Sequence, residues 1–435
     1  MSVVVYEPTI TESAVECRVA PSGDVRRFFA GDTFRAEYDV DVSRVPPAIA
    51  VVPVLAQVCP VAWANGADVE VPVVDATFLN ALSEVRDVLR RMYPEFIEGG
   101  EIRAARVVDT RTDRSPAAYG DVGMLFTGGV DSVASYVRHR DEDPTLVSVQ
   151  GWVVGVDKDD RWDGAREHVE TFASQHGLET RYVRSNALSV LDMPMLQAHY
   201  KRFVDGAWYS SVGHGLGLLG LCAPLADARG LGTIHVAASH TAGFDQPWGS
   251  HPDIDDRVRW TYTSGHHDGF DLTRQDKIDL IADYVETDDR RFPLRTCIHD
   301  ETGGNCNACE KCYRTMVGLV LAGLDPTRFG YEMDARTWAE IREAFERRAF
   351  VMDDHTKFHW ADIQDHVTSD REFPVDGATG FFEWLAQVDL DDVASSATTP
   401  TSDRLVRAVA RNLPYPVYAS VYPVYESLKT NLATR

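Results

Sequence analysis

Lysine is scarce in this chain. Only six of its 435 residues are lysine, while 67 acidic residues against 43 basic ones leave a formal net charge of −24. Such a balance disfavours tight binding to a long nucleic acid. It is typical of proteins from high-salt cytoplasms, where salt screens the repulsion between like charges. We therefore expect the acidity to reflect habitat; an acidic interaction surface is the alternative.

The sequence also lacks a long uninterrupted hydrophobic run. The longest apolar stretch, residues 46–64, is rich in valine but broken by Gln57 and three prolines. We interpret it as a pair of buried strands rather than a membrane span. Residues 1–5 contain no basic segment of the kind that opens a secretory signal peptide. We therefore expect a cytoplasmic protein with no membrane partner.

Cysteine is infrequent, and four of the seven lie close together. The odd total and the spacing Cys297-x8-Cys306-x2-Cys309-x2-Cys312 exclude a regular disulfide framework. Four thiolates at this spacing can enclose a Zn²⁺ ion tetrahedrally and leave no open position, which predicts a structural metal site. An iron–sulfur cluster and a set of unpaired cysteines are the alternatives.

The pattern of apolar residues divides the chain into three regions. Residues 1–118 contain short valine-rich runs and one helical stretch at 77–92, which indicates an α+β accessory domain. In residues 119–325, short strands alternate with helices, which is typical of a parallel sheet covered on both faces. Among them we expect one long buried helix at 210–228. Residues 326–435 indicate a mostly helical C-terminal region.

A glycine-containing loop lies where the first strand of the second region ends. Thr127-Gly128-Gly129-Val130-Asp131-Ser132 follows the apolar run 122–126 and precedes a helical stretch. Two glycines let the backbone approach a ligand closely, and a helix N-terminus presents free N–H groups to an anion. The sequence has neither the Walker pattern nor the G-x-G-x-x-G pattern here. The alternative is a simple helix N-cap.

This loop resembles the SGGxDS motif of the PP-loop ATP pyrophosphatase superfamily, with Thr127 in place of the first serine. The family cleaves ATP between the α and β phosphates, so the resemblance implies an adenine-nucleotide α-hydrolase-like domain that uses ATP and Mg²⁺. It implies ATP contacts from Thr127, Gly128, Gly129, Asp131 and Ser132, of which Asp131 and Ser132 would be catalytic. By order along the sheet, Val153 and Gly155 would contact the adenine; buried strand residues are their alternative role.

The loop and the cysteines together resemble one branch, the 7-cyano-7-deazaguanine synthases. That family ends its PP-loop domain with a C-x8-C-x2-C-x2-C zinc site and carries a substrate loop with the sequence GYPDC. Here Pro252 and Asp253 match its Pro-Asp pair, and His240 and Asp245 lie in the same loop. Ser250, His251 and Ile254 depart from it, which leaves the substrate open. A Pro-Asp turn is the alternative role.

The resemblance implies an ATP-dependent synthase that forms AMP and pyrophosphate. It would adenylate a carboxylate, such as that of 7-carboxy-7-deazaguanine, for attack by ammonia. Two alternatives are a PP-loop enzyme that modifies tRNA, a peptide or a protein, and a non-catalytic nucleotide-binding module. Thr273 and Asp276 predict a capping box at a helix start. We expect Lys277, which follows, to be a solvated helix lysine; a position facing the phosphates is the alternative.

Overall fold

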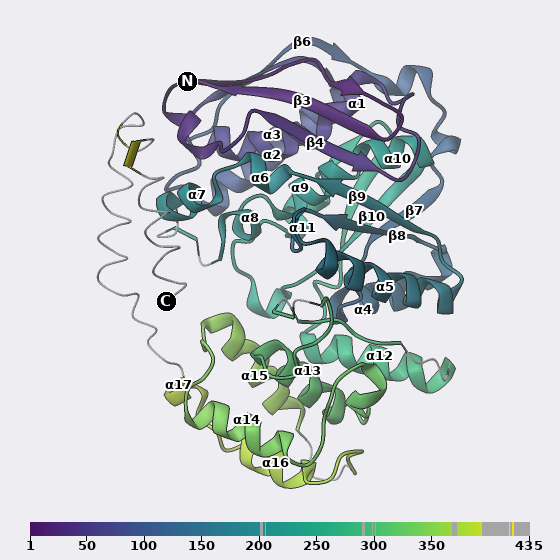
Figure 1. Ribbon diagram of the computed structural model, residues 1–435, viewed down its shortest axis with the longest axis vertical. Helices are drawn as coiled ribbons and strands as arrows, with labels where there is room; N and C mark the ends of the chain where they lie inside the picture. The colour runs from purple at the N-terminus through teal and green to yellow at the C-terminus, as the bar shows by residue number, and fades with distance from the viewer. Residues whose placement is uncertain are drawn as a thin grey trace.

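The computed structural model describes residues 1–393 apart from 201–202, 205, 289–291, 298, 301 and 368–371; beyond 393 it describes only 417, 420 and 421. A twelve-stranded sheet forms its framework, with the order β11-β12-β10-β7-β8-β9-β4-β3-β1-β5-β6 and β2 paired to β3 (Figure 1). The strands are β1 (Ser2–Val5), β2 (Thr9–Ile10), β3 (Ala14–Pro21), β4 (Thr33–Tyr38), β5 (Asp68–Asp75), β6 (Ile102–Val108), β7 (Asp121–Leu125), β8 (Thr145–Gln150), β9 (Thr180–Ser185), β10 (Leu231–Ala237), β11 (Arg259–Trp260) and β12 (Thr263–Asp268).

The sheet has two parallel parts joined by antiparallel strands. Strands β12, β10, β7, β8 and β9 are parallel neighbours, and so are β1, β5 and β6. Strand β4 pairs antiparallel with β9, and β3 lies antiparallel between β4 and β1. The strands before residue 118 therefore belong to the same sheet as those that follow. The predicted α/β class, with a large mostly parallel sheet and helices, is confirmed.

Helices cover both faces of the sheet. Because successive strand residues point to opposite faces, Leu146 packs in one hydrophobic cluster and Val147 in another. The cluster around Val147 contains α1 (Pro47–Ala50), α2 (Val52–Trp63), α3 (Ala76–Met92), α6 (Ala187–Val190), α7 (Met193–Tyr200), α8 (Trp208–Ser211), α9 (His214–Leu221), α10 (Ala223–Arg229) and α11 (Pro252–Asp255). The cluster around Leu146 contains α4 (Val130–His139), α5 (Asp159–His176), α12 (Arg274–Asp288), α13 (Glu310–Leu321), α14 (Thr337–Glu346), α15 (Asp354–His366), α16 (Ala378–Leu385) and α17 (Leu390–Val393).

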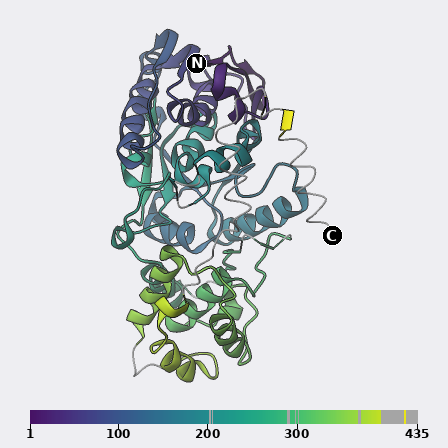
Figure 2. The same ribbon diagram turned by 90° about the vertical axis from the view of Figure 1, so that its left-hand side faces the viewer.

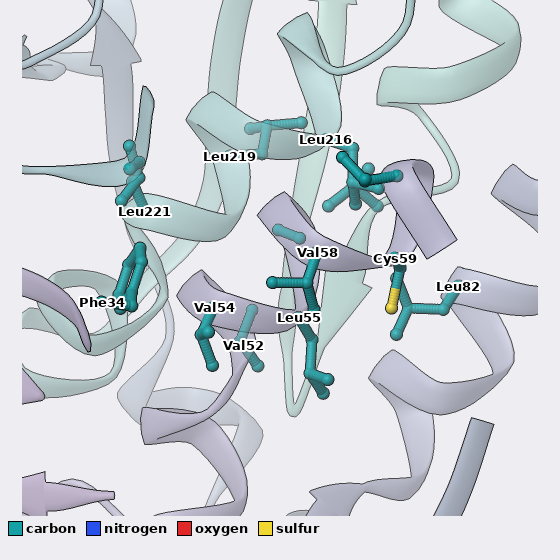
Figure 3. Close-up of a cluster of buried hydrophobic side chains, with 14 of the residues drawn as sticks. Phe34, Val52, Val54, Leu55, Val58, Cys59, Leu82, Leu216, Leu219 and Leu221 are labelled. Atoms are coloured by element: carbon teal, nitrogen blue, oxygen red, sulfur yellow. The ribbon is translucent and has the colours of Figure 1, made fainter. Parts of the chain in front are cut away.

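The prediction of buried strands in residues 46–64 is wrong, because this stretch forms α1 and α2. Every residue of α2 is buried, and the helix packs against α9 in the core that Figure 3 shows. The helix penalty of β-branched residues is a few tenths of a kcal/mol each, whereas burying a valine side chain contributes about 1.5 kcal/mol or more. Pro47 and Pro53 occupy the first turns of their helices, where a missing N–H costs nothing.

The prediction of one long helix at 210–228 is also wrong in the extent of the helix. The chain forms three short helices there, α8, α9 and α10. Gly213 precedes α9, and Pro224 lies in the first turn of α10, where its ring cannot continue a preceding helix.

The helices after residue 310 gather at one end of the molecule. Figures 1 and 2 show α13 to α17 opposite the end that carries β1 and β6. Helix α15 packs against both α12 and α13. The predicted helical character of this region is seen as far as Val393; the Ser/Thr-rich part that follows lies outside the described residues. In the part of the chain that the structure describes, no helix is both long enough and apolar enough to span a membrane.

Candidate functional site

The order of the strands predicts where a ligand binds. After β7, the chain continues through β8 and β9 on one side and returns to β10 on the other. In open α/β sheets, ligands bind at such a reversal, outside the carboxyl ends of the strands. The loop from Thr127 to Ser132 follows β7, and the loop from Ala238 to His251 follows β10. The candidate ATP loop and the candidate substrate loop therefore flank the same point of the sheet.

The glycine loop has the conformation that its sequence predicts. Gly128 has a φ of +73°, a left-handed conformation that favours glycine. A Cβ at this position would lie 2.3 Å from the imidazole of His168, which packs on the loop from α5. Gly129 caps α4 in an extended conformation. The Ser132 hydroxyl donates to the Gly129 carbonyl at 3.2 Å and accepts from the Thr127 amide at 3.4 Å.

Asp131 is held between two cations. Its carboxylate accepts from the Arg274 guanidinium at 3.0 Å and from the Lys277 Nζ at 3.3 Å. Burial opposes ionisation of Asp131, but Arg274 and Lys277 outweigh it and lower its pKa below the ordinary value. Burial likewise lowers the pKa of Lys277, and Asp131 counteracts this. The expectation that Lys277 is solvated is wrong, since only 3% of its side chain is exposed.

Further positive charge surrounds this pair. Lys311 is close enough to Asp131 to stabilise its ionised form, and Arg314 interacts electrostatically with both Asp131 and Arg274. Arg314 is buried and pairs with Glu310 at 2.9 Å. In a chain with a net charge of −24, such a concentration of cations is unusual. It gives the site the sign that an anionic ligand requires.

Val153 and Gly155 lie beyond the end of β8 rather than within it. The side chain of Val153 is exposed, so the alternative role as buried strand residues does not apply to it. Gly151, just after the strand, has a φ of +97° and approaches the Ser185 carbonyl so closely that no Cβ would fit. The segment 151–156 stays beside β9, since Arg184 of that strand donates to the Val156 carbonyl at 3.0 Å.

The candidate substrate residues fall into two groups. His251 links Asp245 to the start of α11: its Nε2 lies 3.1 Å from Asp245, and its Nδ1 accepts from the Asp253 amide. Pro252 is the first residue of that helix. The Asp253 side chain is 53% exposed and pairs with Arg257. The Pro-Asp pair thus begins a short helix.

A buried carboxylate that the sequence reasoning missed lies two residues later. Asp255 is fully buried and accepts from the Ser250 hydroxyl at 2.6 Å. It also lies 2.8 Å from Nδ1 of His267. Gly215 leaves the space for this carboxylate, since a Cβ there would meet it at 1.6 Å. A single sequence offers no signal for Asp255, because the fold alone buries it and leaves Asp253 exposed.

His240, the remaining candidate substrate residue, contacts the C-terminal region. Its ring lies 4.6 Å from that of Trp248 and 4.6 Å from that of His355 on α15. Nε2 of His355 and Nε2 of His359 are 3.0 Å apart. Burial lowers the pKa of His240 to about 4 and that of His355 to about 3. These rings are therefore neutral at neutral pH. The i, i+4 spacing of His355 and His359 indicates that the two share one helix face, but it does not indicate that they meet His240.

The four cysteines converge as predicted. The Sγ atoms of Cys297 and Cys309 are 4.0 Å apart, those of Cys306 and Cys312 are 3.9 Å apart, and those of Cys309 and Cys312 are 3.5 Å apart. A tetrahedral zinc site with bonds of about 2.3 Å separates its sulfur atoms by about 3.8 Å. The four thiols can therefore hold a metal ion such as zinc.

A pocket of about 870 Å³ lies beside the cysteine site. It is bounded by α13, α14 and the segment that enters α15, and its lining includes Cys309, Lys311, Phe350 and Thr356. Thr356 directly follows His355 in the chain. The pocket thus brings the cysteine cluster, one of the cations and α15 together.

Comparison with known proteins adds no relative to this description: no family model, curated protein or solved structure matches the chain.

Proposed function

We propose that the protein is an ATP-dependent enzyme of the PP-loop type that forms AMP and pyrophosphate while activating a carboxylate for attack by ammonia. The observation that carries the proposal is the strand–Gly-Gly–helix loop at the sheet reversal, with Asp131 clamped by Arg274 and Lys277. Loop amides and a helix N-terminus suit the phosphates of ATP, and the surrounding cations suit the developing charge on pyrophosphate.

The chemistry divides into balanced steps. A carboxylate oxygen of the acceptor attacks the α-phosphorus of ATP, and the bond to the β-phosphate oxygen breaks as pyrophosphate leaves. Ammonia then attacks the activated carbonyl carbon and expels AMP, and the lost proton goes to solvent or base. In a nitrile-forming enzyme, the amide oxygen attacks the α-phosphorus of a second ATP and expels pyrophosphate. Cleavage of the C–O bond then releases AMP, and the amide nitrogen gives up its two protons to solvent or base, which leaves the nitrile. The part of this chain is to position the reactants and stabilise the leaving groups.

Metal ions enter this proposal in two ways. Mg²⁺ would come with the ATP phosphates, as its preference for oxygen ligands requires. We assign it no protein ligand, because both carboxylate oxygens of Asp131 already face cations. Zinc is the metal that we propose for the four cysteines, which fit one tetrahedral ion. An iron–sulfur cluster would place irons and sulfides between the thiolates and separate them further.

The surroundings of His240 favour a flat heteroaromatic acceptor. The rings of Trp248 and His355 both pack against His240. Nε2 of His355 is already paired with His359, whereas Nδ1 of the neutral His240 is buried without a hydrogen-bond partner in the described part of the chain and is left for a ligand. Such groups suit stacking and hydrogen bonding to the edge of a nucleobase-like acid. This observation supports a small acceptor of the 7-carboxy-7-deazaguanine type over a peptide, a protein or tRNA.

The test measures pyrophosphate and AMP from ATP and Mg²⁺ in high-salt buffer, with and without 7-carboxy-7-deazaguanine and ammonium. We expect release that depends on both, and formation of the nitrile. Asp131→Asn should lower the rate about 10²-fold or more, whereas Asp141→Asn, at a side chain that is 96% exposed, should not. Pyrophosphate release that does not depend on 7-carboxy-7-deazaguanine would contradict the proposed acceptor. ATP binding without pyrophosphate release under any condition would contradict the proposed enzymatic activity and favour a non-catalytic nucleotide-binding module, and absence of ATP binding would contradict both.

A further inference from the structure

A second group of metal-ligating side chains lies outside the site described above. His139 ends α4, His235 lies in β10 and His266 lies in β12. His235 and His266 are register partners on adjacent parallel strands, so both side chains leave the same face of the sheet. One ring nitrogen from each of the three histidines lies within 4.8 Å of the others. Three separate elements thus deliver imidazoles to one point.

A carboxylate contacts two of the three histidines. Oε1 of Glu142 lies 2.9 Å from Nδ1 of His139, and its Oε2 lies 2.9 Å from Nε2 of His235. The rings of His139 and His235 stack at 3.9 Å. Glu142 thus presents one carboxylate oxygen to each of two imidazoles that come from different elements.

The surroundings resemble the outer shell of a metal site. Histidines that bind a metal through one ring nitrogen usually donate a hydrogen bond from the other ring N–H to a carboxylate, which fixes the orientation and the tautomer of the ring. Oδ1 of Asp268 lies 3.0 Å from Nε2 of His139. Oδ1 of Asp256, the carboxylate oxygen near His266, lies 3.8 Å from its Nδ1, which is beyond hydrogen-bond distance. Nδ1 of His235 is buried without a hydrogen-bond partner, so this ring keeps an uncommitted nitrogen.

We propose that His139, His235, His266 and Glu142 form a second metal site, which takes a divalent transition-metal ion of the zinc type. Imidazole ligands favour zinc, nickel or copper over magnesium and calcium. Three nitrogens and one carboxylate complete a tetrahedral shell, so the ion is structural. It ties the C-terminus of α4 to β10 and β12. Because α4 begins at the glycine loop, the ion also anchors the helix that supports that loop. The proposal does not depend on the reaction that the loop serves.

The metal content of the full-length chain tests this proposal. The protein is stripped with a chelator, saturated with Zn²⁺, desalted and analysed for metal. We expect two ions per chain in the wild type and one in His266→Ala and in Glu142→Gln. Both side chains are partly exposed, His266 to 48% and Glu142 to 42%, so these variants should fold. Asp141→Asn removes a neighbouring exposed carboxylate and should retain both ions.

Substitution with Co²⁺ separates the two sites. Thiolate-to-cobalt charge transfer reports the cysteine site, whereas the histidine site contributes only ligand-field bands. We expect His266→Ala to lose a ligand-field component and to retain all the charge-transfer intensity. One ion per chain in the wild type, or two ions in both cluster variants, would overturn the proposal. The cluster would then be an ion pair between Glu142 and protonated histidine.

Discussion

The backbone amide of Arg295 donates a hydrogen bond of 2.8 Å to the carbonyl oxygen of Gly128. Arg295 lies two residues before Cys297, and its side chain donates to the Gly303 carbonyl within the loop between the cysteines. A Cβ at Gly129 would meet the Arg295 carbonyl at 3.2 Å. The segment that leads into the cysteine site therefore rests directly on the glycine loop. We infer that a metal held by the cysteines also fixes the loop.

Removing that metal should consequently weaken nucleotide binding as well as lower stability. Cys306→Ser removes a partly exposed ligand, and we expect loss of the cysteine-bound ion, a lower melting temperature and ATP affinity reduced about 10-fold or more. Metal analysis, thermal unfolding and titration with a fluorescent nucleotide measure these effects. Cys222→Ala is the matched control, because Cys222 is buried outside the cluster. Unchanged ATP affinity in metal-free Cys306→Ser would contradict the coupling.

Gly128→Ala should lower the free energy of unfolding by more than the cost of its backbone strain alone. A left-handed alanine costs about 1 kcal/mol, and the methyl group would also meet the His168 ring. Gly177 has a similar φ of +71°, and a Cβ added there would have nothing within 4 Å, so Gly177→Ala isolates the strain. We expect Gly128→Ala to lose at least twice as much unfolding free energy in urea denaturation. Adding His168→Ala should restore part of it; equal losses at the two glycines would exclude the clash.

The pairing of Asp131 with Lys277 predicts a non-additive pair of substitutions. Lys277→Met leaves a largely buried carboxylate with Arg274 alone, and we expect a loss of about 3 kcal/mol in stability. Asp131→Asn combined with Lys277→Met removes both charges and should recover part of that loss. ATP turnover should stay low in Lys277→Met, in Asp131→Asn and in the double variant. Strictly additive losses of stability in urea unfolding would show that the two side chains do not interact.

Much of the fold follows from local patterns in the sequence. The sequence predicts strand β7, the loop after it and α4 in order, because a short apolar run, two glycines and a helical period occur in succession. The capping box at α12 is also confirmed: the Thr273 hydroxyl accepts from the Asp276 amide, and the Asp276 carboxylate accepts from the Thr273 amide. The cysteine cluster is predictable because short spacings restrict its geometry.

The failures have a common physical cause, which is tertiary burial. The sequence predicts strand for α2 because valines favour sheets locally, and packing on all sides outweighs that preference. It predicts a solvated Lys277 because most helix lysines are solvated. In the structure, Lys277 is buried and donates hydrogen bonds to Asp131 and to the Ala238 carbonyl. Neither His355 nor Asp255 can be assigned to the site from sequence, because the folded chain alone brings them to their partners.

The neutral histidines predict a loss of stability in mild acid. Burial lowers the pKa of His355 to about 3, and His240, Arg314 and Arg274 add to this while Asp353 opposes it. In the unfolded chain, the pKa returns to about 6.5. Between these values the unfolded state binds more protons, so stability rises with pH and falls as the pH drops from about 6.5.

Urea unfolding between pH 4.5 and 7 can assign this slope to one residue. One proton corresponds to about 1.4 kcal/mol per pH unit, and we expect His355→Leu to flatten the curve by up to that amount. His366→Leu, on the same helix, should have the opposite effect. Burial disfavours its charge, but the Asp362 carbonyl and nearby carboxylates raise the pKa of His366 overall, so its contribution is present in acid and lost as the pH rises. Parallel curves for the wild type and His355→Leu would show that His355 is not held neutral, and would remove the basis for a neutral ring surface beside the glycine loop.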